Sequence, residues 1–395
     1  MTVFLDTVLT RNPELVESAA ELHTSGAIPP DTYVIDLDAV EANARLLAAE
    51  AERLGMTLWF VAKQFGRNPE LIRAIAQHIP RFAAIDLPEA RILHASGARA
   101  GNLGHLVQIP TRSLPEVLAW RPEAVTVYDA ANAEAVGREA ERLGTVQDVL
   151  VRLQGAPGTV YPGQEGGVPL DRLDDFAERV ERLPGVRIAG VTAFPCVLCD
   201  PVTGEPEPTA NLPLAVAARD RLAARGHEGL KLSAPSASSV TTLALLARHG
   251  ATHAEPGHAL TGTTPLHAVD AHQPERPAYV YVTEVAHTLA DGRPAVLGGG
   301  FYPRARIKQA LLPRSGARLA VQDAPAENID YYRLLDVPAT PDAARIGDTA
   351  VLAFRTQIFV TRSNVAVVAG LSRGTPRLCG LYDALGRALD QETPS

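Results

Sequence analysis

Lys63 is one of only three lysines among the 37 basic residues of this 395-residue chain, and it ends the apolar run of "LWFVAKQFGRNP" (58–69). Arginine is therefore the usual cation of this sequence. An arginine keeps its proton at any accessible pH, whereas a lysine in apolar surroundings can lose it and become a nucleophile. The position of Lys63 predicts covalent chemistry at its amine; the alternative is a strand-end lysine that only reaches solvent.

A second stretch, "LKLSAPSASS" (230–239), closes an expected strand and opens an expected helix with small hydroxyl residues. Backbone N–H groups at a helix N-terminus bind phosphate well, so Ser236 and the neighbouring amides are candidates for a phosphate site. The alternative is that serine and proline only cap this helix.

The stretch "HAEPGHALTGT" (253–263) places Glu255 at another expected strand end, before a Pro-Gly turn. The amides of Gly257 and His258 are candidates to contact the same phosphate. Glu255 alone is equally compatible with a solvated loop. A lysine for an imine, a phosphate site and a carboxylate that protonates a ring nitrogen are the groups that pyridoxal phosphate requires. We therefore predict this cofactor.

Four further residues are candidates at the same end of the expected strands. Arg152, in "VLVRLQ", suits a bidentate pair with a substrate carboxylate, although a structural ion pair is an equal alternative. Tyr161 and Gln164 lie in the Gly-rich "TVYPGQEGG" and either contact substrate or only shape the turn. His105, on an expected strand, either contacts the cofactor or is a core histidine.

These residues need a scaffold, and strand-like runs alternate with amphipathic windows such as 40–55 and 131–144. Repeated βα units with apolar strands indicate a parallel sheet covered by helices, and about eight of them predict a (β/α)8 TIM-type barrel. In such a barrel the chemistry lies at the carboxyl ends of the strands, where Lys63 falls. The expected strands are 32–37, 58–62, 81–86, 105–110, 124–129, 148–154, 187–194, 230–234 and 252–256.

From about residue 277 strands follow one another without helices, which predicts a second, β-rich domain. We expect an N-terminal helical extension at 1–30 with a helix over 12–25, a cofactor-binding barrel at 31–265 and a C-terminal β domain at 266–395.

Composition limits the partners. A formal net charge of −8 without a basic run argues against nucleic-acid binding. The sequence contains no stretch of 18 apolar residues, so we predict no membrane span. Three cysteines give no disulfide framework, so we expect a cytoplasmic protein. Cys196 and Cys199 form a C-x-x-C without the second ligand pair that structural zinc needs, and we predict no metal.

The chain resembles the alanine racemase-like, fold type III pyridoxal phosphate enzymes, and most closely their YhfX-like branch. The resemblance covers nearly the whole chain, through "KQFGRNP", "GHLVQIP", "YPGQE", "FPC", "APSAS", "HAEPGHALTGT" and "FRTQIFVTRS". It implies a barrel followed by a β domain, a homodimer with shared active sites, and Lys63 as the Schiff-base lysine. Ser236 matches the family's phosphate-binding serine. "EPG" resembles the decarboxylase motif in which Glu255 meets the pyridine nitrogen and Gly257 the phosphate.

Departures from the racemase pattern qualify this resemblance. Alanine racemases place an arginine where Glu255 stands, and their histidine beside the cofactor falls near Ala193. Their opposite-face tyrosine comes from the partner subunit, in a motif that aligns with "LGGGFYPRA" (297–305), where Tyr302 is a shifted substitute. Asp330 and Tyr331 are further candidates to reach across a dimer interface.

The leading hypothesis is a racemase or epimerase that acts at Cα of an amino acid, with Lys63 and Tyr302 as the two bases. A glutamate at the ring nitrogen makes a deeper electron sink, which keeps decarboxylation or retro-aldol cleavage as an alternative. A non-catalytic protein that binds and buffers pyridoxal phosphate is the third hypothesis.

Overall fold

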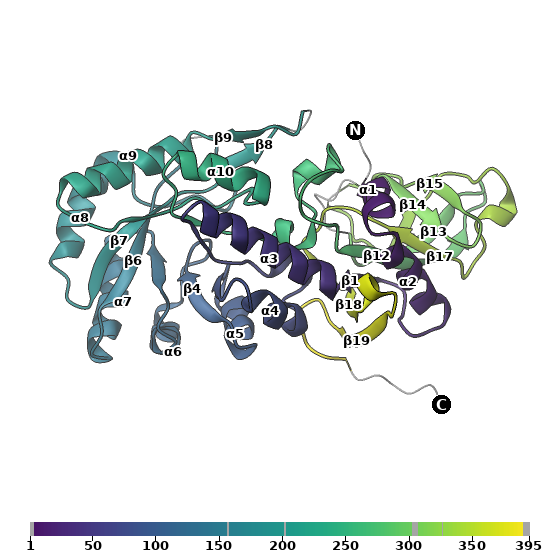
Figure 1. Ribbon diagram of the computed structural model, residues 1–395, viewed down its shortest axis with the longest axis horizontal. Coiled ribbons are helices and arrows are strands. Elements are labelled where there is room, and N and C mark those ends of the chain that lie inside the picture. The colour runs from purple at the N-terminus through teal and green to yellow at the C-terminus, as the bar shows by residue number, and fades with distance from the viewer. Residues whose placement is uncertain (1–3, 156–157, 201–202, 302–306, 326, 390–395) are drawn as a thin grey trace. The chain divides into compact units, whose positions relative to one another are not determined.

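Eight short strands form a parallel sheet in the computed structural model, which describes residues 4–155, 158–200, 203–301, 307–325 and 327–389. The hydrogen-bonded order is β2-β11-β10-β7-β6-β5-β4-β3. Figure 1 labels β4, β6 and β7 of this sheet, with the helices α5 to α9 around it. Phe60 bridges the two ends, since its N–H donates to the carbonyl of Arg81 at 3.0 Å and its carbonyl accepts from Ala83 at 2.9 Å. The predicted barrel is therefore confirmed. Its strands are β2 (Thr57–Leu58), β3 (Arg81–Ala83), β4 (Arg99–Leu103), β5 (Ala124–Val127), β6 (Gln147–Arg152), β7 (Val186–Thr192), β10 (Lys231–Ser233) and β11 (His253–Ala254).

A helix precedes β2 and one lies between each pair of consecutive barrel strands. In α7, the residues Ala133, Val136 and Ala140 form the buried stripe, and the Asp129 side chain caps the first turn by accepting from the Asn132 N–H at 2.8 Å. Within the described residues, no helix is both long and apolar enough to cross a bilayer. The helices are α3 (Leu37–Arg53), α4 (Pro69–Ala76), α5 (Leu87–Ala95), α6 (Leu114–Ala119), α7 (Ala130–Arg142), α8 (Leu173–Glu181), α9 (Asn211–Ala224) and α10 (Val240–Arg248).

A nine-stranded sheet forms the predicted β-rich part. It contains β12 (Tyr279–Thr288), β13 (Pro294–Leu297), β14 (Gln309–Leu312), β15 (Ala317–Ala320), β16 (Tyr332–Leu334), β17 (Thr349–Leu352), β18 (Asn364–Ala369) and β19 (Arg377–Tyr382), together with β1 (Thr32–Asp36). A short ribbon of β8 (Val197–Cys199) and β9 (Pro206–Pro208) stands apart from both sheets.

Two of the expected barrel strands are wrong. The run 32–37 forms β1, which lies between β12 and β18 of the nine-stranded sheet, antiparallel to the first and parallel to the second. All five of its residues are buried, as in a barrel strand, so its pattern suits either sheet.

The run 105–110 is not a strand, because β4 ends at Leu103. Gly104 has φ +85°, and a Cβ there would lie 2.7 Å from the carbonyl oxygen of Thr126. Within β4, a Cβ on Gly101 would strike the Trp59 ring at 2.4 Å, so glycine is required where sequence propensity argues against a strand.

Contacts divide the chain into two compact units. The barrel unit comprises Ala44–Ala62 and Ile75–Gly257, and the sheet unit comprises Met1–Asn43, Lys63–Ala74 and His258–Ser395. The division predicted from the sequence uses three continuous segments, 1–30, 31–265 and 266–395, whereas each compact unit combines separate segments of the chain. The predicted division stays a prediction.

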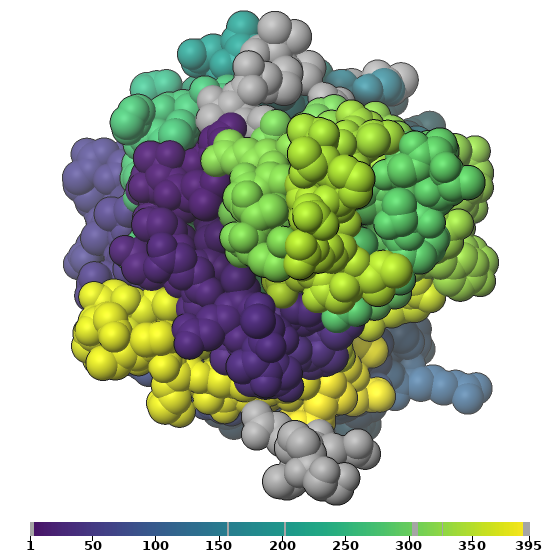
Figure 2. Space-filling model, turned by 90° about the vertical axis from the view of Figure 1, so that its right-hand side faces the viewer, coloured from purple at the N-terminus to yellow at the C-terminus, as the bar shows by residue number. Residues whose placement is uncertain are grey.

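The N-terminal helices α1 (Phe4–Arg11) and α2 (Pro13–Thr24) belong to the core of the sheet unit. Their residues Leu5, Val8, Leu15, Val16 and Ala19 share a cluster of buried side chains with strand residues of β1, β12, β17 and β18. Figure 2 shows these helices, in purple, against the yellow-green and yellow C-terminal segments. The N-terminal piece is therefore part of the core.

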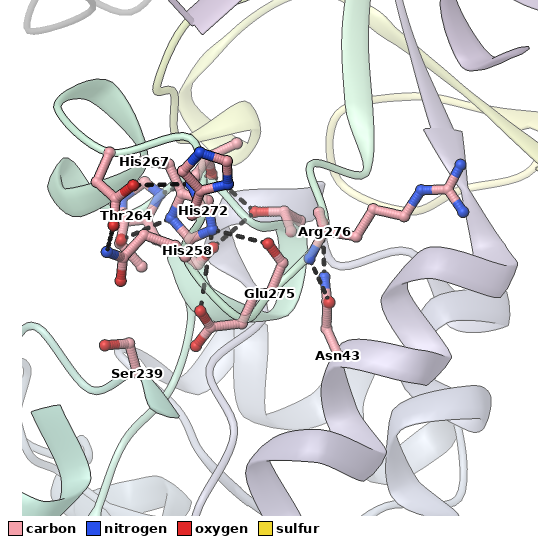
Figure 3. A network of polar contacts seen from close by, with 12 residues as sticks. Asn43, Ser239, His258, Thr264, His267, His272, Glu275 and Arg276 are labelled. Atoms are coloured by element: carbon pink, nitrogen blue, oxygen red, sulfur yellow. Dashed lines mark hydrogen bonds and ion pairs between the residues drawn. The ribbon is translucent and has the colours of Figure 1, made fainter. Parts of the chain in front are cut away.

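A buried polar network orders the segment 258–276 in the sheet unit (Figure 3). Asn43 Nδ2 donates to the carbonyl of Arg276 at 2.8 Å, and its Oδ1 accepts from the Arg276 N–H at 2.8 Å. His267 Nε2 lies 3.0 Å from the carbonyl oxygen of Glu275, which can only accept, and Nδ1 lies 2.8 Å from Thr264 Oγ1. Burial lowers the pKa of His267 to about 4, so its imidazole is neutral at pH 7.

We expect Leu15→Ala to destabilise the folded chain by about 2–5 kcal/mol, because Leu15 is fully buried between α2 and the sheet. Urea unfolding followed by circular dichroism measures this. The exposed Glu17→Ala on the same helix is the control. Equal midpoints for the two variants would contradict the packing of α2.

We also expect a pH effect from His267. In the unfolded chain His267 has its ordinary pKa of 6.5, so it is protonated at a higher pH than in the folded chain. The stability that neutral His267 provides is therefore present above pH 6.5 and falls by about 2 kcal/mol as the pH is lowered from 7 to 5. The unfolding midpoint should fall less between pH 7 and pH 5 in His267→Gln than in the wild-type protein. The exposed His249→Gln serves as control, and an identical acid loss in all three proteins would refute the assignment.

Candidate active site

Lys63 begins the 3-10 helix η1 (Lys63–Phe65), directly after Ala62, and its side chain is half-buried. Gly66 follows with φ +68°, and a Cβ there would lie 3.0 Å from a methyl group of Ile358. The Arg67 guanidinium lies over the Phe359 ring, 5.0 Å from its centre. The "KQFGR" turn thus packs tightly within the sheet unit, and this explains its glycine.

His258 begins a second 3-10 helix, η4 (His258–Thr261), which contacts η1 within the sheet unit. Burial, together with the positive charges of Arg355 and Lys63, holds the pKa of His258 well below its ordinary value. Its Nδ1 lies 3.4 Å from Thr263 Oγ1. A neutral imidazole therefore accompanies the lysine.

Glu255 lies in the barrel unit, immediately after β11. Its Oε1 accepts hydrogen bonds from Asn102 Nδ2 and from Ser233 Oγ, each at 3.3 Å, and its N–H donates to Ser238 Oγ at 3.1 Å. Since β4 and β11 are not neighbours in the sheet, the bond from Asn102 crosses the interior of the barrel. Glu255 is therefore held inside the barrel at the carboxyl ends of the strands.

Arg152 is the last residue of β6 and is 1% exposed. Its guanidinium carbon lies 5.8 Å from the ring centres of both Tyr128 and Phe194. Burial lowers the pKa of Arg152, while Tyr128, Cys196 and Glu255 oppose that shift. Its Nε and Nη1 atoms have no hydrogen-bond partner among the described residues. The barrel unit thus contains a buried cation with donors left for a ligand.

Phe194 links three of the predicted residues. The His105 ring meets it edge-on at 5.7 Å, Tyr161 lies 5.9 Å from it, and Arg152 lies over its face. His105 follows β4 rather than lying on a strand, and it is 3% exposed. Gln164 stands in the turn beside them, and its N–H donates to the Tyr161 carbonyl at 3.0 Å. Arg152, His105 and Tyr161 therefore gather around one ring.

Ser236 has φ +96° and Ala237 has φ +50°, a left-handed conformation that non-glycine residues rarely adopt and that is frequent at functional sites. The Ser236 hydroxyl donates to the Val197 carbonyl at 2.7 Å. Helix α10 is capped by Ser239, whose Oγ accepts from the Thr242 N–H at 3.3 Å. The cap that the sequence left open for Ser236 therefore belongs to Ser239.

The remaining candidates are placed as follows. Gly257 is buried and follows Pro256, whose carbonyl accepts from the Val61 N–H at 2.9 Å. Tyr302 lies outside the described residues. Asp330 accepts from the N–H groups of Gly299 and Phe301, each at 3.2 Å.

Apart from Arg152, the polar residues that close the buried barrel strands were not predicted as site residues from the sequence. Asn102 and Ser233 hold Glu255, and Thr126 Oγ1 donates to Asn102 Oδ1 at 2.7 Å. The available signal was one polar residue at or next to the carboxyl end of each otherwise apolar run. That signal occurs at Asn102, Thr126, Arg152, Thr192 and Ser233.

These groups fit pyridoxal phosphate by their chemistry. A carboxylate with fixed donors suits a protonated ring nitrogen, a buried guanidinium with unpaired N–H atoms suits an anionic oxygen, and Lys63 supplies an amine. Among the described residues, no three or more His, Cys, Asp or Glu side chains group as a metal site would require.

Comparisons with known proteins agree with this fit. The model of the alanine racemase N-terminal domain matches residues 35–265, and that of the YhfX-like C-terminal domain matches residues 280–378. The YhfX protein of Escherichia coli (strain K12), described as uncharacterized, is 38% identical over 392 residues, which cover 98% of this chain and all of that protein.

Solved structures share the fold. D-threonine aldolase from Filomicrobium marinum superposes with a TM-score of 0.68 at 16% identity, covering 90% of this chain and 95% of that one. D-threo-3-hydroxyaspartate dehydratase from Delftia sp. HT23 gives 0.65 at 17% identity, covering 91% and 98%. The chain therefore belongs to the YhfX-like branch of the alanine racemase-like, fold type III enzymes, whose cofactor is pyridoxal phosphate.

Proposed function

We propose that this chain racemises or epimerises an amino acid at Cα, with pyridoxal phosphate held by Lys63. The observation that carries chemistry at Cα is the Glu255 carboxylate, fixed inside the barrel by Asn102 and Ser233. Racemisation is preferred among the reactions at Cα because the alanine racemase N-terminal domain model matches residues 35–265. The cofactor, when bound, supplies a conjugated ring that accepts the electron pair left at Cα.

Each predicted residue has a role in this proposal. Lys63 removes or returns the Cα proton on one face, Glu255 keeps a proton on the ring nitrogen, and Arg152 pairs with the substrate carboxylate. The phosphate is held by Ser236 and by the amides of Gly257 and His258. Tyr302 of the other subunit serves the opposite face. His105 contacts the cofactor, and Tyr161 and Gln164 contact the substrate at the rim of the site.

The proposal includes a cytoplasmic homodimer with shared active sites and an amino acid as its small-molecule substrate. In this proposal a neutral His258 helps Lys63 to take up a proton, because a third positive charge next to Lys63 and Arg355 would oppose protonation of the lysine amine. The lysine can therefore alternate between its charged and neutral forms.

Retro-aldol cleavage or decarboxylation is the second candidate. It is favoured by Glu255, which stands where a racemase carries arginine, and by the similarity in fold to D-threonine aldolase. Both reactions leave an electron pair at Cα, so the same groups serve them; release of an aldehyde or of carbon dioxide distinguishes them from racemisation. A non-catalytic carrier is disfavoured, because it has no need of the nine-stranded sheet.

We expect borohydride to fix pyridoxal phosphate on Lys63. Reduction of the purified protein should remove its visible absorption band, and mass spectrometry should find one added phosphopyridoxyl group on the peptide that contains residue 63. Lys63→Ala should bind no cofactor covalently and should lose solvent-deuterium exchange at Cα. Labelling of Lys231 or Lys308 instead would refute the assignment.

We expect Glu255→Gln to keep the fold and to slow deuterium exchange at Cα by roughly 10²-fold or more. Glutamine retains an oxygen that accepts from Asn102 and Ser233, so the change removes mainly the charge. Exchange rates are measured by NMR on a panel of chiral amino acids.

Glu123→Gln is the matched control, because Glu123 accepts from Trp59 and contacts His253 at the amino end of β5, away from the strand ends that carry Glu255. Equal exchange rates for the two variants would contradict the role of Glu255, and wild-type protein inactive toward every chiral amino acid would contradict the proposed racemisation.

A further inference from the structure

Arg152, Thr192 and Ser233 form a row across three adjacent barrel strands. Thr192 is the register partner of Arg152 in β6 and of Ser233 in β10. Register partners on neighbouring strands present their side chains to the same face of the sheet. Ser233 bonds to Glu255, which also accepts the bond that crosses the barrel from Asn102. The row therefore faces the barrel interior.

Two members of this row have unused hydrogen-bond donors. Thr192 is fully buried, and its Oγ1 has no hydrogen-bond partner among the described residues; the same holds for Nε and Nη1 of Arg152. Buried polar groups without a partner cost free energy and require an explanation. A ligand that binds both side chains is the simplest explanation for neighbouring polar atoms without a partner.

The chemistry of the donors selects that ligand. A guanidinium can only donate and carries a positive charge, so its partner is an anionic oxygen. The next residue in the row is Ser233, which is hydrogen-bonded to Glu255. In the proposed function Glu255 contacts the ring nitrogen of the cofactor. In pyridoxal phosphate a single ring carbon separates that nitrogen from the carbon bearing the phenolic oxygen. The phenolic oxygen thus lies on the ring edge beside the nitrogen.

We propose that Thr192 is a cofactor-binding residue whose hydroxyl donates a hydrogen bond to the phenolic oxygen of pyridoxal phosphate, with Arg152 beside it as the compensating charge. The guanidinium has five N–H donors, which leaves some for a substrate carboxylate. This inference rests on the proposed function, since Glu255 at the ring nitrogen sets the orientation of the ring.

The test is Thr192→Val in the full-length protein, with pyridoxal phosphate as the probe and no substrate present. Valine keeps the shape and removes the donor. We expect the cofactor to bind about 3- to 10-fold more weakly, and its absorption spectrum to shift toward the form with a protonated phenol at a given pH. Thr192→Ser should restore both. Thr283→Val is the control, because Thr283 is also fully buried but its hydroxyl is already bonded to the Leu297 carbonyl.

Each other outcome overturns the inference. Unchanged cofactor affinity and spectrum with a raised KM for the amino acid would mean that Thr192 serves the substrate carboxylate. No change in any readout would mean that Thr192 binds neither. Wild-type protein that takes up no pyridoxal phosphate would overturn the proposed function as well, which separates that failure from one confined to Thr192→Val.

Discussion

A carboxylate inside a barrel is stable only when donors surround it, and the hydrogen bonds from Asn102 and Ser233 to Glu255 meet this need. An ionised carboxylate loses several kcal/mol of hydration on burial unless fixed dipoles and charges replace the water. The two donors come from β4 and β10, which have three strands between them in the sheet order. The carboxylate is therefore held correctly only if the whole barrel closes in register. The electrostatics of the site belong to the barrel and do not depend on one loop.

The same dependence on distant segments shapes the sheet unit. β1 pairs with β12 on one side and β18 on the other, so residues near position 34 are hydrogen-bonded to residues near 280 and 366. The helices that precede β1 then complete the hydrophobic core beneath it. Contacts of such long sequence separation form only after large loops close, so neither terminus can order this core alone.

The sequence indicated the barrel and its candidate active-site residues because both depend on local patterns. Lys63 follows an apolar run and Glu255 precedes a Pro-Gly turn, and the alternation of strands with amphipathic helices is visible without any tertiary knowledge. β1 was misplaced for a physical reason: a strand buried on both faces has the same pattern in either sheet. β4 was missed because the close approach of Trp59 requires Gly101, and glycine lowers strand propensity. Thr192 is recognised only when register places it beside Arg152, and Asn102 only when the closed barrel brings it to Glu255.

The distribution of charge resolves an apparent conflict between composition and cofactor. A chain with a formal net charge of −8 should repel an anionic phosphate at long range. Each unit nevertheless places positive charge near its predicted residues. Arg152 is buried in the barrel unit, and in the sheet unit the charges of Arg355 and Lys63 add to burial in lowering the pKa of His258. Water and salt screen the surface carboxylates, whereas charges in a poorly hydrated interior act at close range with less screening. Local charge therefore decides which ligand binds, and the acidic surface mainly affects solubility.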